Sequence, residues 1–421
     1  MTLFLRKRLA LNLLEFRFLG AMALVLLLFG LVSFNHKRVY QRERADLDDE
    51  QLAQRTELSH AHAYSQVLLN MIRQPTPLGI LVAGVGSRYG SIARLGGRFM
   101  VDFPDDPRTQ KILTLAQANP FLAGLLDLDF SRLVLFFFSL LAIFFTYDAI
   151  CGERERGLLK LCLSYSVPRY RLLFGEFAGN AITLVLPLIM MMLLWLVVLQ
   201  LPPSVPLHAT DYGRLGMILS YTVLFLSGFI LLGLWVSALT RSPTTSLAIL
   251  LVIWIGTVIV YPEFVPFLAR WWGPDENSMV STVFQPWTPQ RGEEAWRQRV
   301  RQTLLAERLK VPVPTTAYVQ AVEVMAQTDI GTHIRFVDQA RLWNGRLRSW
   351  QQVKLRQYPG RDSRFEPGPL DISGLPRARY DPEDMSQSVI RTLPNILALI
   401  VFDVGCCLGA LRALRNYIPT E

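Results

Sequence analysis

The chain has 421 residues, of which 51% are hydrophobic and 18% are charged, and its mean hydropathy is +0.28. Its apolar residues are gathered into long blocks, which excludes an ordinary soluble domain and indicates an integral membrane protein. The net charge of +9 does not indicate a nucleic-acid partner, because the two longest segments between the blocks are nearly neutral. The excess of cations lies in the membrane blocks and their short loops.

Six apolar blocks can cross a hydrocarbon core of about 30 Å. The sequence therefore predicts an α-helical integral membrane protein with six transmembrane helices and two mainly helical extracytoplasmic insertions. The second block is short, and "NPFLAGLLDLDF" ahead of it is typical of an amphipathic entry segment. The predicted spans are Phe18 to Phe34, Leu133 to Tyr147, Ala181 to Leu199, Leu215 to Leu239, Ser246 to Tyr261 and Arg391 to Leu411.

The first block resembles the core of a signal peptide, because the cations of Arg6 to Arg8 precede it. It is long, however, and ends in "LVSFNHKR" without a small-x-small cleavage site, so we expect an uncleaved anchor. Upstream, Leu5, Leu9 and Leu13 recur at helical spacing, which favours a short helix at the membrane interface.

The cations beside the spans predict the orientation, because cytoplasmic loops carry an excess of Lys and Arg. With a cytoplasmic N-terminus and C-terminus, most of these cations lie inside. The cytoplasmic ones would be Arg6, Lys7, Arg8, Arg17, Arg154, Arg156, Lys160, Arg169, Arg171, Arg241, Arg412 and Arg415, against Arg132, Arg214 and Arg391 outside.

This topology divides the chain into membrane segments and two large insertions. We expect an interfacial helix and first span in 1–34, a first extracytoplasmic domain in 35–130, four spans in 131–261, a second extracytoplasmic domain in 262–390, and the last span with a cytoplasmic tail in 391–421. The cytoplasmic segment 148–180, between the second and third spans, is called the bridge below.

The first insertion is expected to begin with a helix that ends at Pro75 and Pro77. Its apolar face would carry Leu58, Ala61, Ser65, Leu68 and Ile72. The glycine-rich stretch that follows, 78–103, is predicted to be a turn-rich loop, with "RFMVDF" as a short strand.

The second insertion favours a helical hairpin. Trp296, Val300 and Leu304 repeat every four residues, "VPVP" breaks the pattern, and 316–358 again permits a helix. The segment 359–384, rich in Pro, Gly and charge, is predicted to be an extended connector into the last span.

No residue pattern indicates a metal, a cofactor or a catalytic site. The motifs G-x-x-x-x-G-K-[ST], H-E-x-x-H and G-x-S-x-G are absent from the sequence, so no bound nucleotide or enzymatic activity is expected in this chain. Adjacent Cys406 and Cys407 point to different helix faces, and neither insertion contains cysteine. His60, His62 and His333 are isolated and are expected at the surface.

The bridge "CGERERGLLKLCLSYSVPRYRLLFGEFAGN", with "FFTYDAI" before it, resembles the signature of ABC-2 type transporter permeases. That signature is E-x-E-x-G-T-L, followed by leucines, P-x-x-R and G-K. Leu158 stands where the family usually has Thr, and Glu176 where it usually has Lys. The matching positions are Glu153, Glu155, Gly157, Leu159, Pro168, Arg171 and Gly175.

The resemblance implies a non-catalytic permease subunit of the bacterial inner membrane, from the subgroup with large insertions after the first and fifth spans. Its implied partners are cytoplasmic ATPase subunits, which would bind ATP and Mg²⁺, a second permease copy or a sister permease, and membrane lipid. The implied activity is substrate export or extraction. An alternative is mechanical transmission of ATPase strokes to an extracytoplasmic partner, with nothing crossing the bilayer.

A permease without its own phosphate loop must receive ATP-driven motion through a surface contact, and charges, glycines and a proline in one short bridge suit that task. An ordinary solvated loop would explain the arginines, but not the paired glutamates followed by "GLLKLCL". The residues predicted for the ATPase contact are Glu153, Arg154, Glu155, Arg156, Gly157, Leu159, Pro168, Arg169, Arg171 and Gly175.

Asp403 is the one carboxylate well inside a predicted span. Such a group costs roughly 2.5 to 3.5 kcal/mol at the helix centre on insertion scales, so it should face the bundle interior or a watery path. It is expected either to pack helices together, bonded to hydroxyls such as those of Thr183, Tyr221 or Thr222, or to line the translocation path. Gly405 and Gly409 would allow close helix approach.

Overall fold

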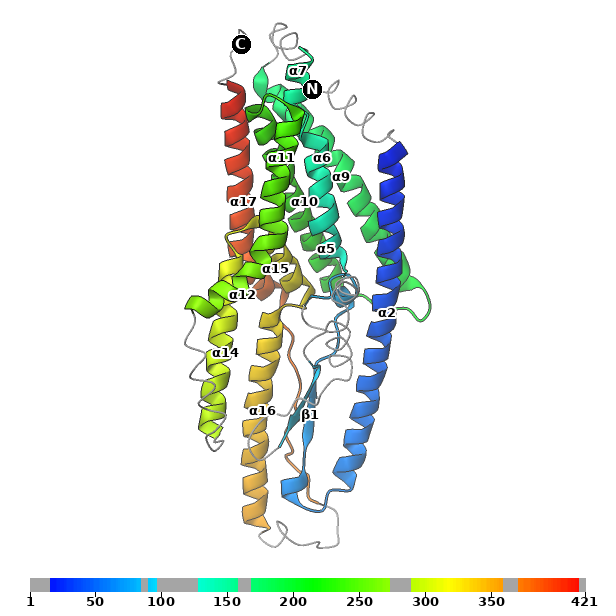
Figure 1. Cartoon of the computed structure of the whole chain (residues 1–421). Helices are drawn as coiled ribbons and strands as arrows, with labels where there is room; N and C mark the ends of the chain where they lie inside the picture. Colours follow the sequence, from blue (N-terminus) through cyan, green and yellow to red (C-terminus); the bar gives the residue numbers. More distant parts are fainter. Residues whose placement is uncertain are drawn as a thin grey trace, which may run out of the picture.

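The computed structural model describes residues 16–84, 90–96, 128–157, 168–272, 289–358 and 370–415. Six of the described helical segments are long and apolar enough to cross a membrane, which confirms the predicted α-helical membrane protein with six spans. They form a bundle from which an elongated lobe extends at one end (Figure 1). The spans are α2 (Phe16–Ser59), α5 (Phe130–Leu133) with η4 (Val134–Phe138) and α6 (Ser139–Thr146), α9 (Arg169–Gln200), α10 (Ala209–Leu239), α11 (Pro243–Trp254) with η5 (Ile255–Val260), and α17 (Met385–Arg415).

The helices run beyond the apolar blocks because polar residues fix their ends. The Asp129 side chain accepts a hydrogen bond from the backbone N of Arg132 at 2.9 Å and caps α5. The Ser242 hydroxyl accepts one from the backbone N of Thr245 at 3.3 Å, before Pro243 at the first turn of α11. The longest extension is in α2, which continues as one helix from the bundle to Ser59.

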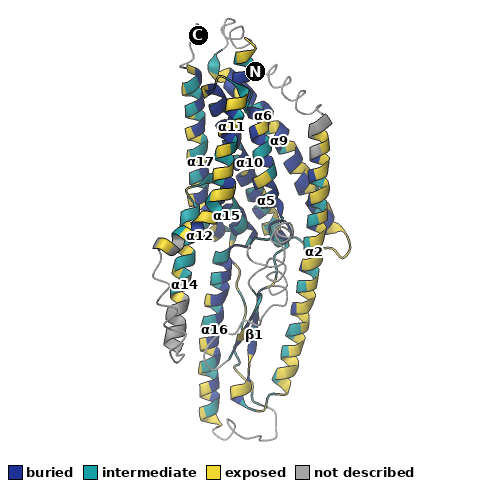
Figure 2. Ribbon diagram, in the orientation of Figure 1, coloured by how far each residue is buried: buried dark blue, intermediate teal, exposed yellow. Residues whose placement is uncertain are grey.

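α10 is the central helix of the bundle and contacts α6, α9, α11 and α17. Its side chains are largely buried, whereas α11 and α17 each keep an exposed apolar face (Figure 2). Two glycines allow neighbours to approach closely. A Cβ at Gly233 would lie 1.8 Å from the Thr146 hydroxyl of α6, and one at Gly228 would lie 2.5 Å from an Asp403 oxygen of α17.

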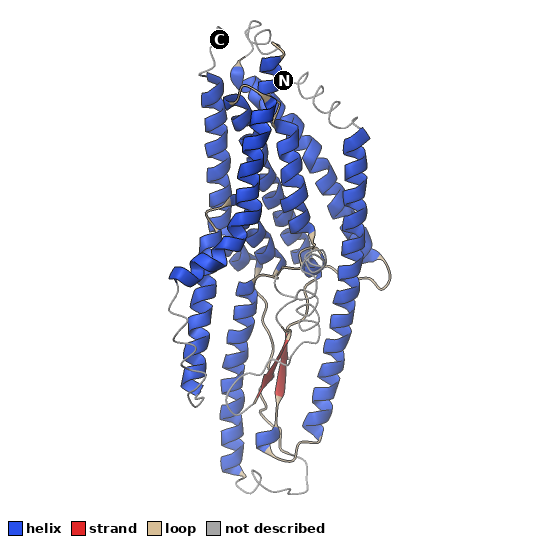
Figure 3. Ribbon diagram, in the orientation of Figure 1, coloured by secondary structure: helices blue, strands red, loops and turns tan. Residues whose placement is uncertain are grey.

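The lobe contains the outer part of α2, a two-stranded sheet and α16 (Ile330–Gln357) (Figure 3). Strands β1 (Leu69–Ile72) and β2 (Ile92–Leu95) pair antiparallel, with Leu69 opposite Leu95 and Ile72 opposite Ile92. The apolar side chains of one sheet face are buried against Phe336, Ala340 and Leu347 of α16. The members of that face are Leu69, Met71, Ala93 and Leu95.

The predicted helical face from Leu58 to Ile72 is wrong. α2 ends at Ser59, a short 3₁₀ turn (η1, Tyr64–Gln66) follows, and Leu69–Ile72 is β1. Strand geometry wins here because pairing with β2 satisfies the backbone and buries every second side chain. The glycine-rich stretch contains a second 3₁₀ turn (η2, Pro77–Ile80) and β2. The predicted strand "RFMVDF" lies outside the described residues.

The second insertion is helical, with the break at "VPVP", but its helices are more than the two of the predicted hairpin, because 316–358 forms two helices and a helix that was not predicted precedes 289. They are α12 (Tyr261–Trp272), α14 (Pro289–Lys310), α15 (Pro314–Ala326) and α16. α15 ends at Gln327, which adopts φ 59. The described part of the connector, 370–384, contains neither helix nor strand, as predicted. It runs beside α16, where the Trp343 and Trp350 indole N–H groups donate to the backbone oxygens of Arg379 and Ser373.

α15 was not expected inside the bundle. It packs against both α10 and α17. Tyr318 is fully buried and stacks on Phe225 of α10, with 4.3 Å between the ring centroids. Its hydroxyl lies 3.2 Å from that of Thr222, and Asn395 of α17 donates to the backbone oxygen of Ala317 at 3.2 Å. α15 thus joins the lobe to the two spans that it touches.

Candidate coupling site

The first half of the bridge is attached to the end of α10. After α6, the chain forms the short helix α7 (Cys151–Glu155). The backbone N–H groups of Ile150 and Cys151 both donate to the Ser237 hydroxyl of α10, at 3.0 and 3.1 Å. α7 is therefore held against α10 by two hydrogen bonds from its main chain to one hydroxyl.

Arg154 turns toward the same helix end. Its two terminal nitrogens donate to the backbone oxygens of Thr240 and Ala238, at 3.1 and 3.2 Å. The last carbonyls of a helix have no partners within it and carry the negative end of the helix dipole, so a guanidinium is well placed there. Arg154, predicted to contact a partner, thus also caps α10 within the chain.

The second half of the bridge is attached to α17 in the same way. Pro168 is the N-cap residue of α9, and Arg169 begins that helix. An Arg169 nitrogen donates to the backbone oxygens of Leu414, at 2.9 Å, and Arg415. The two ends of the bridge are therefore bonded to the ends of two different spans, α10 and α17.

Between these attachments, three predicted contact residues face solvent. Glu155, Arg156 and Gly157 are exposed, and Gly157 has φ +73, a conformation that favours glycine. Arg171 is also exposed, with its guanidinium 6.0 Å from the ring centroid of Tyr170. Of the remaining predicted residues, Glu153 is half-buried, Gly175 is buried in α9, and Leu159 lies outside the described residues. Glu176, which stands where the family usually has Lys, is also buried in α9.

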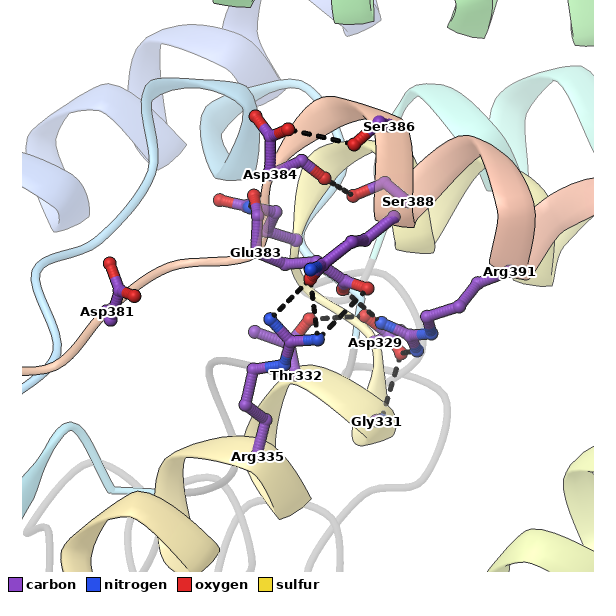
Figure 4. Close-up of polar contacts among 12 residues, drawn as sticks. Asp329, Gly331, Thr332, Arg335, Asp381, Glu383, Asp384, Ser386, Ser388 and Arg391 are labelled. Carbon is purple, nitrogen blue, oxygen red and sulfur yellow. Dashed lines mark hydrogen bonds and ion pairs between the residues drawn. The ribbon is translucent and has the colours of Figure 1, made fainter.

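A second polar cluster, at the opposite end of the bundle, was missed by sequence reasoning. Arg391 of α17 contacts the carboxylates of Asp329 and Glu383, both of which are 3% exposed (Figure 4). Arg335 of α16 lies 3.5 Å from the Glu383 carboxylate. Asp329 caps α16 by accepting from the backbone N of Gly331 at 2.9 Å.

Arg214 of α10 completes this cluster. It donates to the backbone oxygen of Met325 in the last turn of α15 and to the Ser388 hydroxyl, both at 3.1 Å, and to the backbone oxygen of Glu383 at 2.8 Å. We call Arg214, Asp329, Arg335, Glu383 and Arg391 the clamp. It bonds α10 and α17 to α15, α16 and the connector. Arg214 and Arg391, two of the three outer cations beside the predicted spans, were the signal that could have found it.

Asp403 faces the bundle, as predicted, but its partner is different. The hydroxyl of Ser227 in α10 donates to one carboxylate oxygen. The other oxygen is buried, and within the described part of the chain it has no hydrogen-bond partner. The expected hydroxyls bond elsewhere: those of Thr183 and Thr222 donate to carbonyls of their own helices, and Tyr221 pairs with Thr392.

Among the described residues, no three His, Cys, Asp or Glu side chains lie together in a way that would bind a metal ion. Cys151, Cys406 and Cys407 are free thiols, and Cys162 lies outside the described residues. Within the described ranges of the chain, the polar contacts at the two ends of the bundle are hydrogen bonds and ion pairs.

Comparison with known proteins gives a family match and two similar relatives. The family model "ABC-2 family transporter protein" matches residues 15–337. The chain is 32% identical over 132 residues to a probable ABC transporter permease protein NosY of Pseudomonas aeruginosa, covering 31% of this chain and 48% of that protein. It is 41% identical over 56 residues to the protein of the same name in Stutzerimonas stutzeri, covering 13% of this chain and 20% of that protein.

The matched stretches thus span about half, or less, of each relative's length. The family match is much longer and reaches from the start of the first span through the lobe helices to α16. With six apolar helices, a bridge that carries most of the permease signature, and a family match over most of its length, the chain belongs to the ABC-2 family of transporter proteins.

Proposed function

We propose that this chain is the non-catalytic membrane subunit of an ABC transporter in a bacterial inner membrane, with the bridge and both termini in the cytoplasm. The start of α2, the bridge and the end of α17 lie at one end of the bundle (Figure 1). Arg154, Arg156, Arg169 and Arg171 lie there too, which agrees with the positive-inside rule. The lobe is then extracytoplasmic.

A separate cytoplasmic ATPase would bind ATP and Mg²⁺ and dock on the exposed part of the bridge. The exposed charges of Glu155, Arg156 and Arg171 give that surface both signs of charge, which suits a specific and orientated contact. The observation that carries the proposal is the attachment of the two bridge ends to α10 and α17 by Arg154 and Arg169. A movement of the bridge would therefore act directly on both α10 and α17.

The test is charge reversal at the exposed positions. In the double variant Glu155→Lys, Arg156→Glu, we expect the ATPase subunit that co-purifies with the native chain to be lost, while membrane insertion is kept. Glu57→Lys, exposed in the lobe part of α2, is the matched control. Undiminished co-purification with the double variant would place the ATPase contact elsewhere.

The expected activity is export or extraction of a substrate, with a second permease copy or a sister permease completing the path. The exposed apolar faces of α11 and α17 would be covered by that second subunit or by lipid. They include Ile249, Val252, Ile259, Val401, Val404 and Leu408, all at least 41% exposed. The direct measurement is transport of substrate across the membrane of vesicles that contain this chain, the ATPase and ATP.

The clamp favours a second function, in which strokes are passed to an extracytoplasmic partner without transport. The clamp bonds α10 and α17, the two spans to which the bridge is attached, to the lobe. We expect the distance between probes at exposed Leu52 of α2 and Leu342 of α16 to change when the complex binds ATP. The change should be absent in Arg391→Gln. If the distance does not respond to ATP while substrate still moves, export is the one of these two functions that is supported.

A further inference from the structure

The lobe contains a long cleft of about 1270 Å³ between α2, β1 and the connector. On α2 it is lined by His36, Tyr40, Glu43, Gln54 and Leu58, all on one side of the helix. At 1.5 Å per helical residue, these positions extend over about 33 Å. An extended chain rises about 3.3 Å per residue, so roughly ten residues would fill that length.

One edge of β1 is open toward this cleft. The backbone N of Arg73 donates to the oxygen of Ser91 at 2.8 Å, which fixes the alternation of the antiparallel ladder. Met71 therefore bonds to β2, whereas the N–H and C=O groups of Asn70 and Ile72 point away from it. Both of these residues line the cleft.

The other three sides of β1 are occupied. β2 covers one edge, and α16 packs on the face that carries Leu69 and Met71. α2 lies over the opposite face, where the Glu50 carboxylate accepts from the Asn70 amide at 3.0 Å and from Arg94 at 3.4 Å. In the described part of the chain, no strand pairs with the other edge of β1, which borders the cleft, and the connector forms the far wall of the cleft.

The cleft is positively charged. Among the described residues that line it, the exposed cationic side chains are those of Arg55, Arg377 and Arg379, and the one carboxylate is that of Glu43. Glu43 is already engaged, because it accepts a hydrogen bond from the Ser91 hydroxyl at 2.7 Å. An occupant with acidic side chains would therefore meet a local excess of positive charge from these three exposed arginines.

We propose that the cleft binds an extended, acidic polypeptide segment of a partner protein, which adds as a third strand to the free edge of β1. An unpaired strand edge beside open space is a template for strand addition, and side-chain chemistry then provides selectivity. A lipid tail would fill the length but could not satisfy the edge groups of Asn70 and Ile72. The inference rests on the proposed function only in placing the partner outside the cytoplasm.

The test uses the full-length chain in detergent and a fluorescent ten-residue peptide that alternates Val and Glu. We expect it to bind, and to slow hydrogen exchange at the amides of Asn70 and Ile72 but not at that of Met71, which β2 already holds. A peptide that alternates Val and Lys, and the Val-Glu peptide with methylated backbone nitrogens, should bind at least about tenfold more weakly.

On the protein, the exposed pair Arg55→Glu, Arg377→Glu should weaken binding of the Val-Glu peptide about tenfold. Arg356→Glu, exposed on α16 outside the cleft, should not change it. Equal binding of the acidic and basic peptides, or binding without protection of Asn70 and Ile72, would overturn the proposal. So would slow exchange of these two amides before any peptide is added, because the edge would then already be covered. None of these measurements involves the ATPase.

Discussion

At the scale of single residues, cations at helix ends recur in this protein. Lys37 of α2, 2% exposed, donates to the backbone oxygens of Val198 and Leu201 at the end of α9. Arg154, Arg169 and Arg214 serve α10, α17 and α15 in the same way. Each supplies donors and positive charge to carbonyls that have no partner in their own helix. Cations counted in a sequence as orientation signals thus also fasten helices to one another.

Arg154→Ala should lower the free energy of unfolding by about 1 to 2 kcal/mol, because two bonds to the charged guanidinium are lost. Arg156→Ala removes a neighbouring exposed cation and should change it by less than about 0.5 kcal/mol. Thermal unfolding of the two purified variants in the same detergent makes the comparison. Equal destabilisation would mean that the cap contributes no net stability.

Asp403→Asn tests the carboxylate inside the bundle. Asn keeps the shape and can still accept from Ser227, so we expect normal assembly. Loss of ATP-driven activity in this variant would assign the charge to the translocation path. Unaltered activity, with poor assembly of Asp403→Ala, would assign Asp403 to helix packing.

At the scale of elements, α10 and α17 depend on close approach. Gly228→Ala places a Cβ within 2.5 to 2.8 Å of Asp403 and Phe402, and overpacking of this kind typically costs about 1 to 3 kcal/mol. The matched control is Gly405→Ala on α17, because a Cβ added there would have no atom within 4 Å. It should be neutral or slightly stabilising, because Ala favours helices. The relative melting temperatures decide, and a less stable Gly405→Ala would contradict the packing argument.

The elements that the sequence predicted well are those with a long one-dimensional pattern. All six predicted spans lie within described helices or overlap them closely, because an apolar run of sufficient length has few alternatives in a membrane. β1 was mistaken for helix, since Leu68 and Ile72 suit a helical face and a strand alike, and pairing with β2 decided between them. α15 was predicted as helix, but its burial between α10 and α17 depends on tertiary packing.

The bridge was found from its local motif, but the inward direction of two of its arginines was not. The acceptors of Arg154 lie 84 and 86 residues away along the chain, and those of Arg169 lie 245 and 246 away. The clamp joins Arg391 to Asp329 across 62 residues. Contacts at such separations leave no periodic trace in one sequence.

At the scale of the whole molecule, Glu323 of α15 and His333 of α16 make stability depend on pH in opposite ways. Removal from water raises the pKa of Glu323 in α15 to about 8; Lys310 opposes this rise, and nearby carboxylates add to it. Burial, assisted by Arg73, lowers the pKa of His333 in α16 to about 4. Both groups are thus kept neutral in the folded protein near pH 7.

The signs follow from proton binding. Glu323 binds its proton more strongly when folded, so its contribution is most favourable below about pH 4.5 and is lost as the pH rises to about 8. His333 binds its proton more weakly when folded, so its contribution is present above about pH 6.5 and is lost as the pH falls to about 4.

Glu323→Gln should therefore be more stable than the native chain at pH 8, and the difference should shrink toward pH 5. Melting temperatures in detergent across this range are the measurement. His333→Gln provides the complementary control, because it should remove the loss of stability below pH 6.5 without altering the behaviour at pH 8. A pH-independent difference between Glu323→Gln and the native chain would contradict the assignment.

The length of α2 and its attachment near Lys37 determine how far its outer end would move. It is one helix of 44 residues, held at Lys37 by the end of α9 and, one turn later, by a bond from Gln41 to the backbone oxygen of Pro203 at 2.7 Å. If α2 pivots at Lys37, the stretch from there to Ser59 is the part that swings, and it is about 33 Å long. A tilt of about 10° at Lys37 would move the end of this stretch by about 6 Å. Small rotations among the spans would thus be amplified at the far end of the lobe.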